Sequence, residues 1–263
     1  MLVLVGSSAG FSIATASSTD LRRQPVRRVA IVGGTHGNEL LGIKLVGMLQ
    51  QRPEEARRKS FETVCVLANP EAIAVSQRYV SVDLNRCFTS EALDGDPDAC
   101  SVEETRAREL DAMLGPKWSE SPQCDLCLDV HTTTSAVGTC LMMAREDSLA
   151  VELAAHLQRR WPAIRIVFWA KSREETGTLP TLARSGMTVE VGALPQGVCT
   201  WRHFEETRRR EPRPAHPRHA PPDWCTAAAP GVTRPPLWWA CAGCWGGLSI
   251  GSRRGTWRWT AGG

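Results

Sequence analysis

A histidine and a glutamate three positions apart, His36 and Glu39, lie in the glycine-rich segment GGTHGNE. The segment follows a strand-like run and precedes an amphipathic stretch, so both side chains can point at one ion. A second histidine, His131, ends another strand-like run. Two histidines and one glutamate form a ligand set that holds zinc and leaves a fourth position open for water. An open zinc site is typical of hydrolysis.

Neighbouring residues strengthen this interpretation. Gly33, Gly34 and Gly37 permit unusual backbone angles around His36. Asp129 lies two residues before His131 and therefore on the same face of the strand, where its carboxylate can orient the imidazole. A phosphate-binding loop is the alternative for the glycine-rich turn, but the Gly-Lys-Ser/Thr ending of such loops is missing.

Hydrolysis also needs a base, and Glu190 is the candidate. It lies inside the apolar run MTVEVG. A carboxylate buried in a strand is costly unless it is paired, metal-linked or protonated. Desolvation would raise its pKa, which suits a base that works near neutral pH. The alternative is a structural glutamate in a salt bridge.

A third group comprises Arg78 and the segment DLNR, which contains Asn85 and Arg86. Two arginines can polarise a carbonyl and hold a carboxylate through bidentate hydrogen bonds. Spacing alone favours an ordinary polar surface loop for these residues.

The elements that must position these groups alternate in α/β fashion. Strands are expected over residues 29–32, 63–67, 126–130, 138–143, 164–169 and 187–191, and helices over 39–49, 102–114 and 148–160. This alternation predicts a mixed or parallel sheet with helices on its faces. Catalytic groups then belong at the ends of the strands.

Composition narrows the class of protein. The chain has 263 residues, 42% of them hydrophobic, and a net charge of +3, which is too small to argue for a nucleic-acid or membrane partner. No apolar window is long enough for a transmembrane helix. Cys124 and Cys127 are expected to be buried free thiols. Without a signal peptide, reduced cysteines indicate a cytoplasmic protein.

The two ends of the chain differ in character from the middle. Residues 1–26 begin with an uncharged, Ser- and Ala-rich stretch and are expected to be a disordered extension. Residues 201–263 are rich in Pro, Arg and Trp, lack helical or alternating periodicity, and are expected to be a disordered tail. An alternative reading frame, a splice variant or a gene-model artefact would explain such a tail. The catalytic domain is placed at residues 27–200.

Five stretches together resemble the aspartoacylase family, the succinylglutamate desuccinylase/aspartoacylase-type zinc hydrolases. They are VAIVGGTHGNELLG, NPEAIAVSQRYVSVDLNRCF, ETRARELDAMLGPK, LDVHTTTSAVGTCL and VEVGALPQGV. Details such as DLNRCFTS are most similar to the aminoacylase-3 branch, which acts on N-acylated aromatic amino acids and mercapturates. The resemblance implies a zinc carboxypeptidase-like α/β fold: a mixed sheet flanked by helices, incomplete here because the tail lacks the family's β-rich domain.

The resemblance also implies a role for each candidate residue. One zinc ion (Zn2+) per subunit would be held by His36, Glu39 and His131. Glu190 would be the general base, and Arg78 would stabilise the oxyanion. Asn85 and Arg86 would bind the amino-acid portion of the substrate. The implied reaction is hydrolysis of an N-acyl amino acid to a carboxylate and a free amino acid.

Some positions depart from the family pattern. Thr132 replaces the usual Asn after the second histidine ligand, and Tyr79 is the one tyrosine of the chain. Two alternatives therefore stay open: an inactive variant that binds zinc or full-length subunits without turnover, and an aspartoacylase acting on N-acetylaspartate. The Arg- and Trp-rich tail adds nucleic-acid binding as a third, and the sequence leaves open whether the protein is a homo-oligomer.

Overall fold

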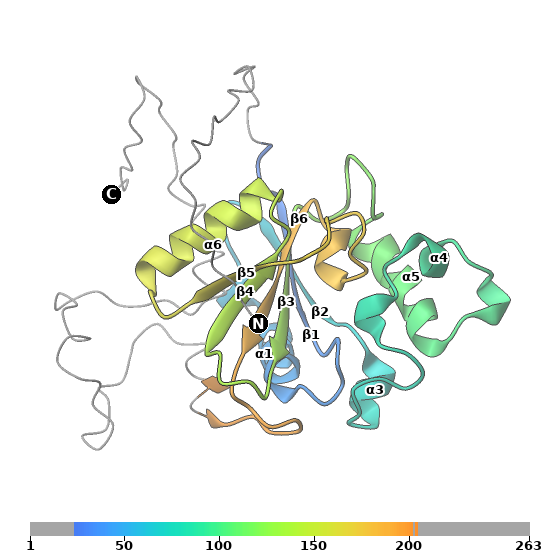
Figure 1. The fold of residues 1–263 in the computed structure, drawn as a ribbon, viewed down its shortest axis with the longest axis horizontal. Coiled ribbons are helices and arrows are strands. Elements are labelled where there is room, and N and C mark those ends of the chain that lie inside the picture. The colour runs from blue at the N-terminus through green and yellow to red at the C-terminus, as the bar shows by residue number, and fades with distance from the viewer. Residues whose placement is uncertain (1–23, 202, 205–263) are drawn as a thin grey trace, which may run out of the picture.

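The computed structural model describes residues 24–201, 203 and 204, which form a mixed sheet of six strands with helices on both faces (Figure 1). The strand order is β2-β1-β3-β6-β4-β5. β1, β2, β3 and β6 run parallel, whereas β4 is antiparallel to β6 and parallel to β5. The strands are β1 Arg28–Gly33, β2 Glu62–Leu67, β3 Leu126–Thr132, β4 Thr139–Met143, β5 Arg165–Phe168 and β6 Ser185–Val191. The predicted fold class and all six predicted strands are confirmed.

The three predicted helices are present as α1, α5 and α6. Ser101 and Glu104 form a reciprocal capping box that begins α5, and Asp147 caps α6 through the amide of Ala150. Short helical turns that the periodicity did not reveal lie between the longer elements. The helices are α1 Leu40–Gln51, α2 Pro53–Ala56, α3 Pro70–Ala74, η1 Leu84–Arg86, α4 Ser90–Leu93, η2 Pro97–Ala99, α5 Val102–Leu114, α6 Ser148–Arg160 and η3 Leu179–Leu182.

Alternating side chains of the central strands divide the core between the two faces of the sheet. In β1, Val29 and Ile31 pack in the cluster that contains the apolar sides of α1 and α6. Ala30 and Val32 pack in the other cluster, with α5 and η3. Because β3 is buried along its whole length, the sheet centre is dry on both faces and its ends are the accessible parts.

Several further expectations concern the chain as a whole. The seven cysteines in the described part are free, and both Cys124 and Cys127 are buried as predicted. No helix among residues 24–204 is long and apolar enough to cross a membrane. Residues 24–26 of the predicted extension are in place, with Val26 buried. Residues 1–23 and 205–263, where disorder is predicted, lie outside the described residues.

Candidate metal centre

The carboxyl ends of β1, β3 and β6 bring the predicted groups to one edge of the sheet. His36 and Glu39 lie in the turn between β1 and α1. His131 lies in β3 and is the register partner of Glu190 in β6. Residues far apart in sequence therefore meet because neighbouring parallel strands end at the same edge.

Glycines allow the first turn to take this path. Gly34 has a φ of +73°, a left-handed conformation that favours glycine. A Cβ on Gly37 would lie 2.1 Å from the carbonyl carbon of Ala72, so only glycine fits against that backbone. The turn delivers Glu39 to the N-cap position just before α1, where its carboxylate does not cap the helix. It points into the site instead.

His36, Glu39 and His131 form a buried group whose candidate ligand atoms all lie within 4.8 Å of one another. Nδ1 of His36 is 2.6 Å from Oε1 of Glu39, and Nδ1 of His131 is 3.1 Å from Oε2. The two Nδ1 atoms are 3.1 Å apart. The structure thus brings together the three predicted ligands.

The outer ring nitrogens explain why these inner atoms suit a cation. Nε2 of His36 is 3.1 Å from Oδ1 of Asp83, and Nε2 of His131 is 2.7 Å from Oδ2 of Asp129. A carboxylate only accepts, so each Nε2 carries a hydrogen, and in the neutral form of the ring each Nδ1 then keeps its lone pair. Two lone pairs and the Glu39 carboxylate then face one another. Such a set repels itself unless a cation lies between, so it fits a divalent metal ion.

Charge in this group is strongly coupled. Burial opposes ionisation of Glu39, but when the rings of His131 and His36 are protonated, as they are without a metal ion, hydrogen bonds from them outweigh burial and lower the pKa of Glu39 to about 2. Burial also opposes protonation of His36, yet hydrogen bonds to Asp83 and Glu39 raise its pKa. The amide of Thr132 adds a further hydrogen bond to Glu39 Oε2, at 2.7 Å. The carboxylate is therefore anionic and fixed in place.

Glu190 differs from Glu39 in having an unused oxygen. The buried Oε2 atom of Glu190 has no hydrogen-bond partner among residues 24–204. Burial raises the pKa of Glu190, although the nearby His131 opposes the shift. The predicted alternative, a glutamate held in a structural salt bridge, has no support among the described ion pairs. The side chain is available to exchange a proton.

Arg78 lies at the rim of the site, with 44% of its side chain exposed. Its Nη2 is 3.0 Å from Oδ2 of Asp83 and its Nη1 is 3.7 Å from Oε1 of Glu39. The guanidinium is therefore close to the group of ligands and open to solvent on its other side.

Asn85 and Arg86 lie in η1, and no contact joins either side chain to the histidines in the described part of the chain. Oδ1 of Asn85 accepts a hydrogen bond from the backbone amide of Leu179 at 2.9 Å. The side-chain NH2 group of Asn85 therefore points away from Leu179. Arg86 is exposed and donates to the carbonyl of Asn85. The two residues join the site through the turn that Asp83 begins.

Asp83 is the functional residue that sequence reasoning missed. Its Oδ1 contacts His36 and accepts the amide of Asn85, while its Oδ2 pairs with Arg78. These contacts hold the pKa of Asp83 well below its usual range, against the effect of burial. Its place at the head of DLNR was visible, but a carboxylate that begins a turn is ordinarily only a cap.

Comparison with known proteins places this geometry in a family. The succinylglutamate desuccinylase/aspartoacylase catalytic domain matches residues 25–211. Over 195 residues the chain is 43% identical to the human N-acyl-aromatic-L-amino acid amidohydrolase (carboxylate-forming), covering 73% of this chain and 61% of the relative. It is 36% identical to a probable aspartoacylase of Nostoc, covering 70% of this chain and 61% of the relative. The chain thus spans about 61% of the length of these curated relatives.

Solved structures agree with the fold. Murine aminoacylase 3 superposes with a TM-score of 0.64 and 38% identity, covering 70% of this chain and 61% of that one. The succinylglutamate desuccinylase from Chromobacterium violaceum shares the fold, with a TM-score of 0.54 and 21% identity over 69% of this chain and 60% of that one. The sheet, the catalytic-domain match and the identity to the amidohydrolase agree, and the chain belongs to the succinylglutamate desuccinylase/aspartoacylase family.

Proposed function

We propose that the protein is a zinc-dependent amidohydrolase that converts N-acyl amino acids into a carboxylate and a free amino acid. The observation that carries the proposal is the convergence of two Nδ1 lone pairs and the Glu39 carboxylate beside Glu190, whose Oε2 is unpartnered in the described part. His36, Glu39 and His131 would hold the ion, since this donor set suits zinc. Bound zinc supplies the Lewis acidity that makes water nucleophilic near neutral pH.

Glu190 moves the proton in this proposal. Oε2 takes a proton from the attacking water and returns it to the departing nitrogen of the amide. Burial raises the pKa of Glu190 toward neutral pH. A carboxyl group whose pKa is near the working pH exchanges protons efficiently in both directions.

The arginines bind charge that the substrate carries or develops. Arg78 donates hydrogen bonds to the oxygen of the scissile carbonyl as it becomes negative, which its position beside Glu39 and Asp83 supports. Arg86 is exposed and pairs with the carboxylate of the amino acid. The side-chain NH2 group of Asn85 donates to the amino-acid portion of the substrate as well.

N-acetylated aromatic amino acids and mercapturates are the proposed substrates. The human, mouse and frog relatives named for N-acyl-aromatic-L-amino acids support this choice. Cleavage of N-acetylaspartate is the second candidate, because the cyanobacterial relatives are named probable aspartoacylases.

Metal analysis of the purified chain together with two deacylation assays tests the proposal. We expect one zinc per chain and a higher kcat/KM for N-acetyl-tyrosine than for N-acetylaspartate. The reverse preference would favour an aspartoacylase. Stoichiometric zinc without turnover of either substrate would favour a protein that binds zinc or other subunits only, and absence of zinc would refute the metal centre.

A further inference from the structure

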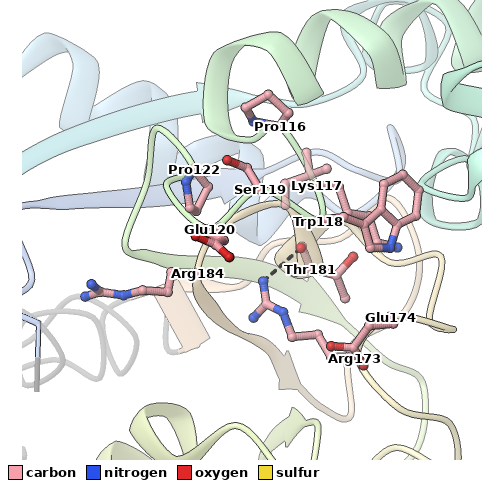
Figure 2. A pocket seen from close by; sticks show the side chains of 12 residues that line it. Pro116, Lys117, Trp118, Ser119, Glu120, Pro122, Arg173, Glu174, Thr181 and Arg184 are labelled. Atoms are coloured by element: carbon pink, nitrogen blue, oxygen red, sulfur yellow. Dashed lines mark hydrogen bonds between the residues drawn. The ribbon is translucent and has the colours of Figure 1, made fainter. Parts of the chain in front are cut away.

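A cavity of about 350 Å³ lies beside the amino ends of β3 and β6 (Figure 2), whereas the metal centre lies at the carboxyl ends of these strands. Its walls are the loop before β3, which includes Lys117 and Trp118, and the segment from Arg173 to Arg184, which leads into β6. β3 and β6 each have seven residues. At about 3.3 Å per residue, the strands separate this cavity from the metal centre by roughly 20 Å.

Two cations meet at this cavity. Lys117 is 6% exposed, and its Nζ donates to the carbonyls of Phe88 and Thr176 at 2.5 and 2.8 Å. The side chain of Arg173 extends into the ring of lining residues, and its Nη2 donates to the carbonyl of Thr181 at 2.9 Å (Figure 2). Burial, and then repulsion from Arg173, lowers the pKa of Lys117 to about 8. The two cations therefore lie close enough to repel each other.

The protein only partly neutralises Arg173. Its one ion pair in the described part is with Oδ2 of Asp147, at 3.4 Å. That carboxylate already accepts the amides of Ala150 and Gly186 and the hydroxyl of Ser185. No ion pair joins Arg173 to the lining carboxylates Glu120 and Glu174 among residues 24–204, so guanidinium N–H groups remain for another acceptor.

Arg184, the third cation in the lining, has its own partners outside the cavity lining. The guanidinium of Arg184 contacts the carbonyls of Gln24 and Pro25, and its Nη2 lies 3.1 Å from Asp125. Figure 2 shows it directed away from Arg173. Arg173 is therefore the cation of the cavity with donors to spare.

Trp118 adds a flat apolar wall beside these charges. Half of its surface, 50%, is exposed, although a tryptophan usually buries most of its ring. Its φ of 64° is in the left-handed region, which a bulky residue rarely adopts. Residues held in such conformations concentrate at functional sites. The ring also lies 4.9 Å from Nζ of Lys117.

We propose that this cavity binds a small carboxylate that carries a flat apolar group. The carboxylate accepts bidentate hydrogen bonds from Arg173, and the apolar group stacks on the indole of Trp118. The volume is at the lower end of the range for ligand sites, which limits the ligand to a small molecule. This site is independent of the metal centre and of the reaction proposed there.

Calorimetric titration of the zinc-loaded full chain with benzoate, acetate and benzamide tests the proposal. Benzoate has both features, acetate lacks the ring, and benzamide lacks the charge. We expect saturable binding of benzoate, and binding at least about tenfold weaker for each of the other two. Arg173→Gln should weaken benzoate at least about tenfold, whereas Arg52→Gln, the same change at an exposed arginine of another surface, should leave it unchanged.

Trp118→Ala provides a second variant in case Arg173→Gln disturbs folding, because an exposed ring contributes little to the core. Circular dichroism of each variant checks the fold. We expect Trp118→Ala to lower the affinity for benzoate more than that for acetate. Benzoate bound at the metal centre would keep its affinity in both variants and lose it in Arg86→Gln. That result, or the absence of benzoate binding to the wild-type chain, would overturn the proposal.

Discussion

The two edges of the sheet differ in the charge of the side chains that gather there. At the carboxyl edge, the carboxylates of Glu39, Asp83 and Asp129 surround two histidines whose inner nitrogens have lone pairs. At the amino edge, Lys117 and Arg173 lie together with incomplete neutralisation. We propose that a cation completes the first edge and an anion the second. Parallel strands give each edge its own set of loops, so one fold can hold both sites without direct contact.

Removing a metal-ligand residue from the carboxyl edge should distinguish the two edges most clearly. His131→Ala deletes one of three converging donors, so we expect zinc affinity to fall about 10³-fold and deacylation to drop to background. Zinc titration with a competing chelator measures the affinity. His156→Ala, a histidine change on α6, is the matched control and should retain zinc. Unchanged zinc affinity in His131→Ala would remove this residue from the ligand set.

Glu190→Gln should separate metal binding from turnover at the carboxyl edge. The amide keeps the size of the side chain but cannot accept the proton, so kcat should fall by about 10²- to 10⁴-fold while zinc stays bound. Single-substrate kinetics on metal-loaded protein measure the effect, and Glu152→Gln on α6 serves as the control. Turnover close to that of the wild type would refute the role of Glu190.

Asp83→Asn should have a smaller effect on the same edge. The substitution weakens the acceptor that orients His36 and also the ion pair with Arg78. Zinc affinity should fall about 10- to 100-fold, the usual consequence of losing a group that orients a metal ligand. A change in turnover alone, at constant zinc affinity, would mean that Asp83 acts through Arg78.

Lys117→Met should affect stability and leave the metal edge intact. It leaves the carbonyl of Phe88 without its buried donor and the carbonyl of Thr176 with the Thr181 hydroxyl alone, at a cost of about 1–3 kcal/mol in the free energy of unfolding. Urea denaturation measures the loss. Zinc content should stay at one per chain. If zinc is lost from folded Lys117→Met protein, the two edges are coupled and the comparison fails.

Local sequence patterns predicted the elements well where a single periodicity dominates. Residues 102–114 carry acidic and basic side chains that offset one another before the stop Gly115-Pro116, residues 148–160 carry apolar side chains on one side, and α5 and α6 have these bounds. The alternation of strands and helices predicted a mixed or parallel sheet, and the sheet is mixed. The short turns α3, α4 and η1 were not predicted, because four or five residues show no measurable period.

For the candidate site, the sequence indicated which residues take part, but it did not indicate which hydrogen bonds join them. His36, Glu39 and His131 do converge, and Glu190 lies in register with His131. The role of Asp83 was not predicted, because its partner, His36, is 47 positions away. The engagement of Asn85 with Leu179, across 94 positions, was equally invisible. Contacts of such separation depend on how loops return to the sheet.

The sequence by itself determined the strands, the principal helices and a donor set able to hold a metal, since these follow from residue type and short-range spacing. Tertiary structure decided which atom of each donor faces inward. Asp83 and Asp129 occupy the outer nitrogens and leave two Nδ1 atoms 3.1 Å apart. It also decided that Arg173 and Lys117 share a cavity. Both outcomes arise from long-range packing, which a local pattern does not encode.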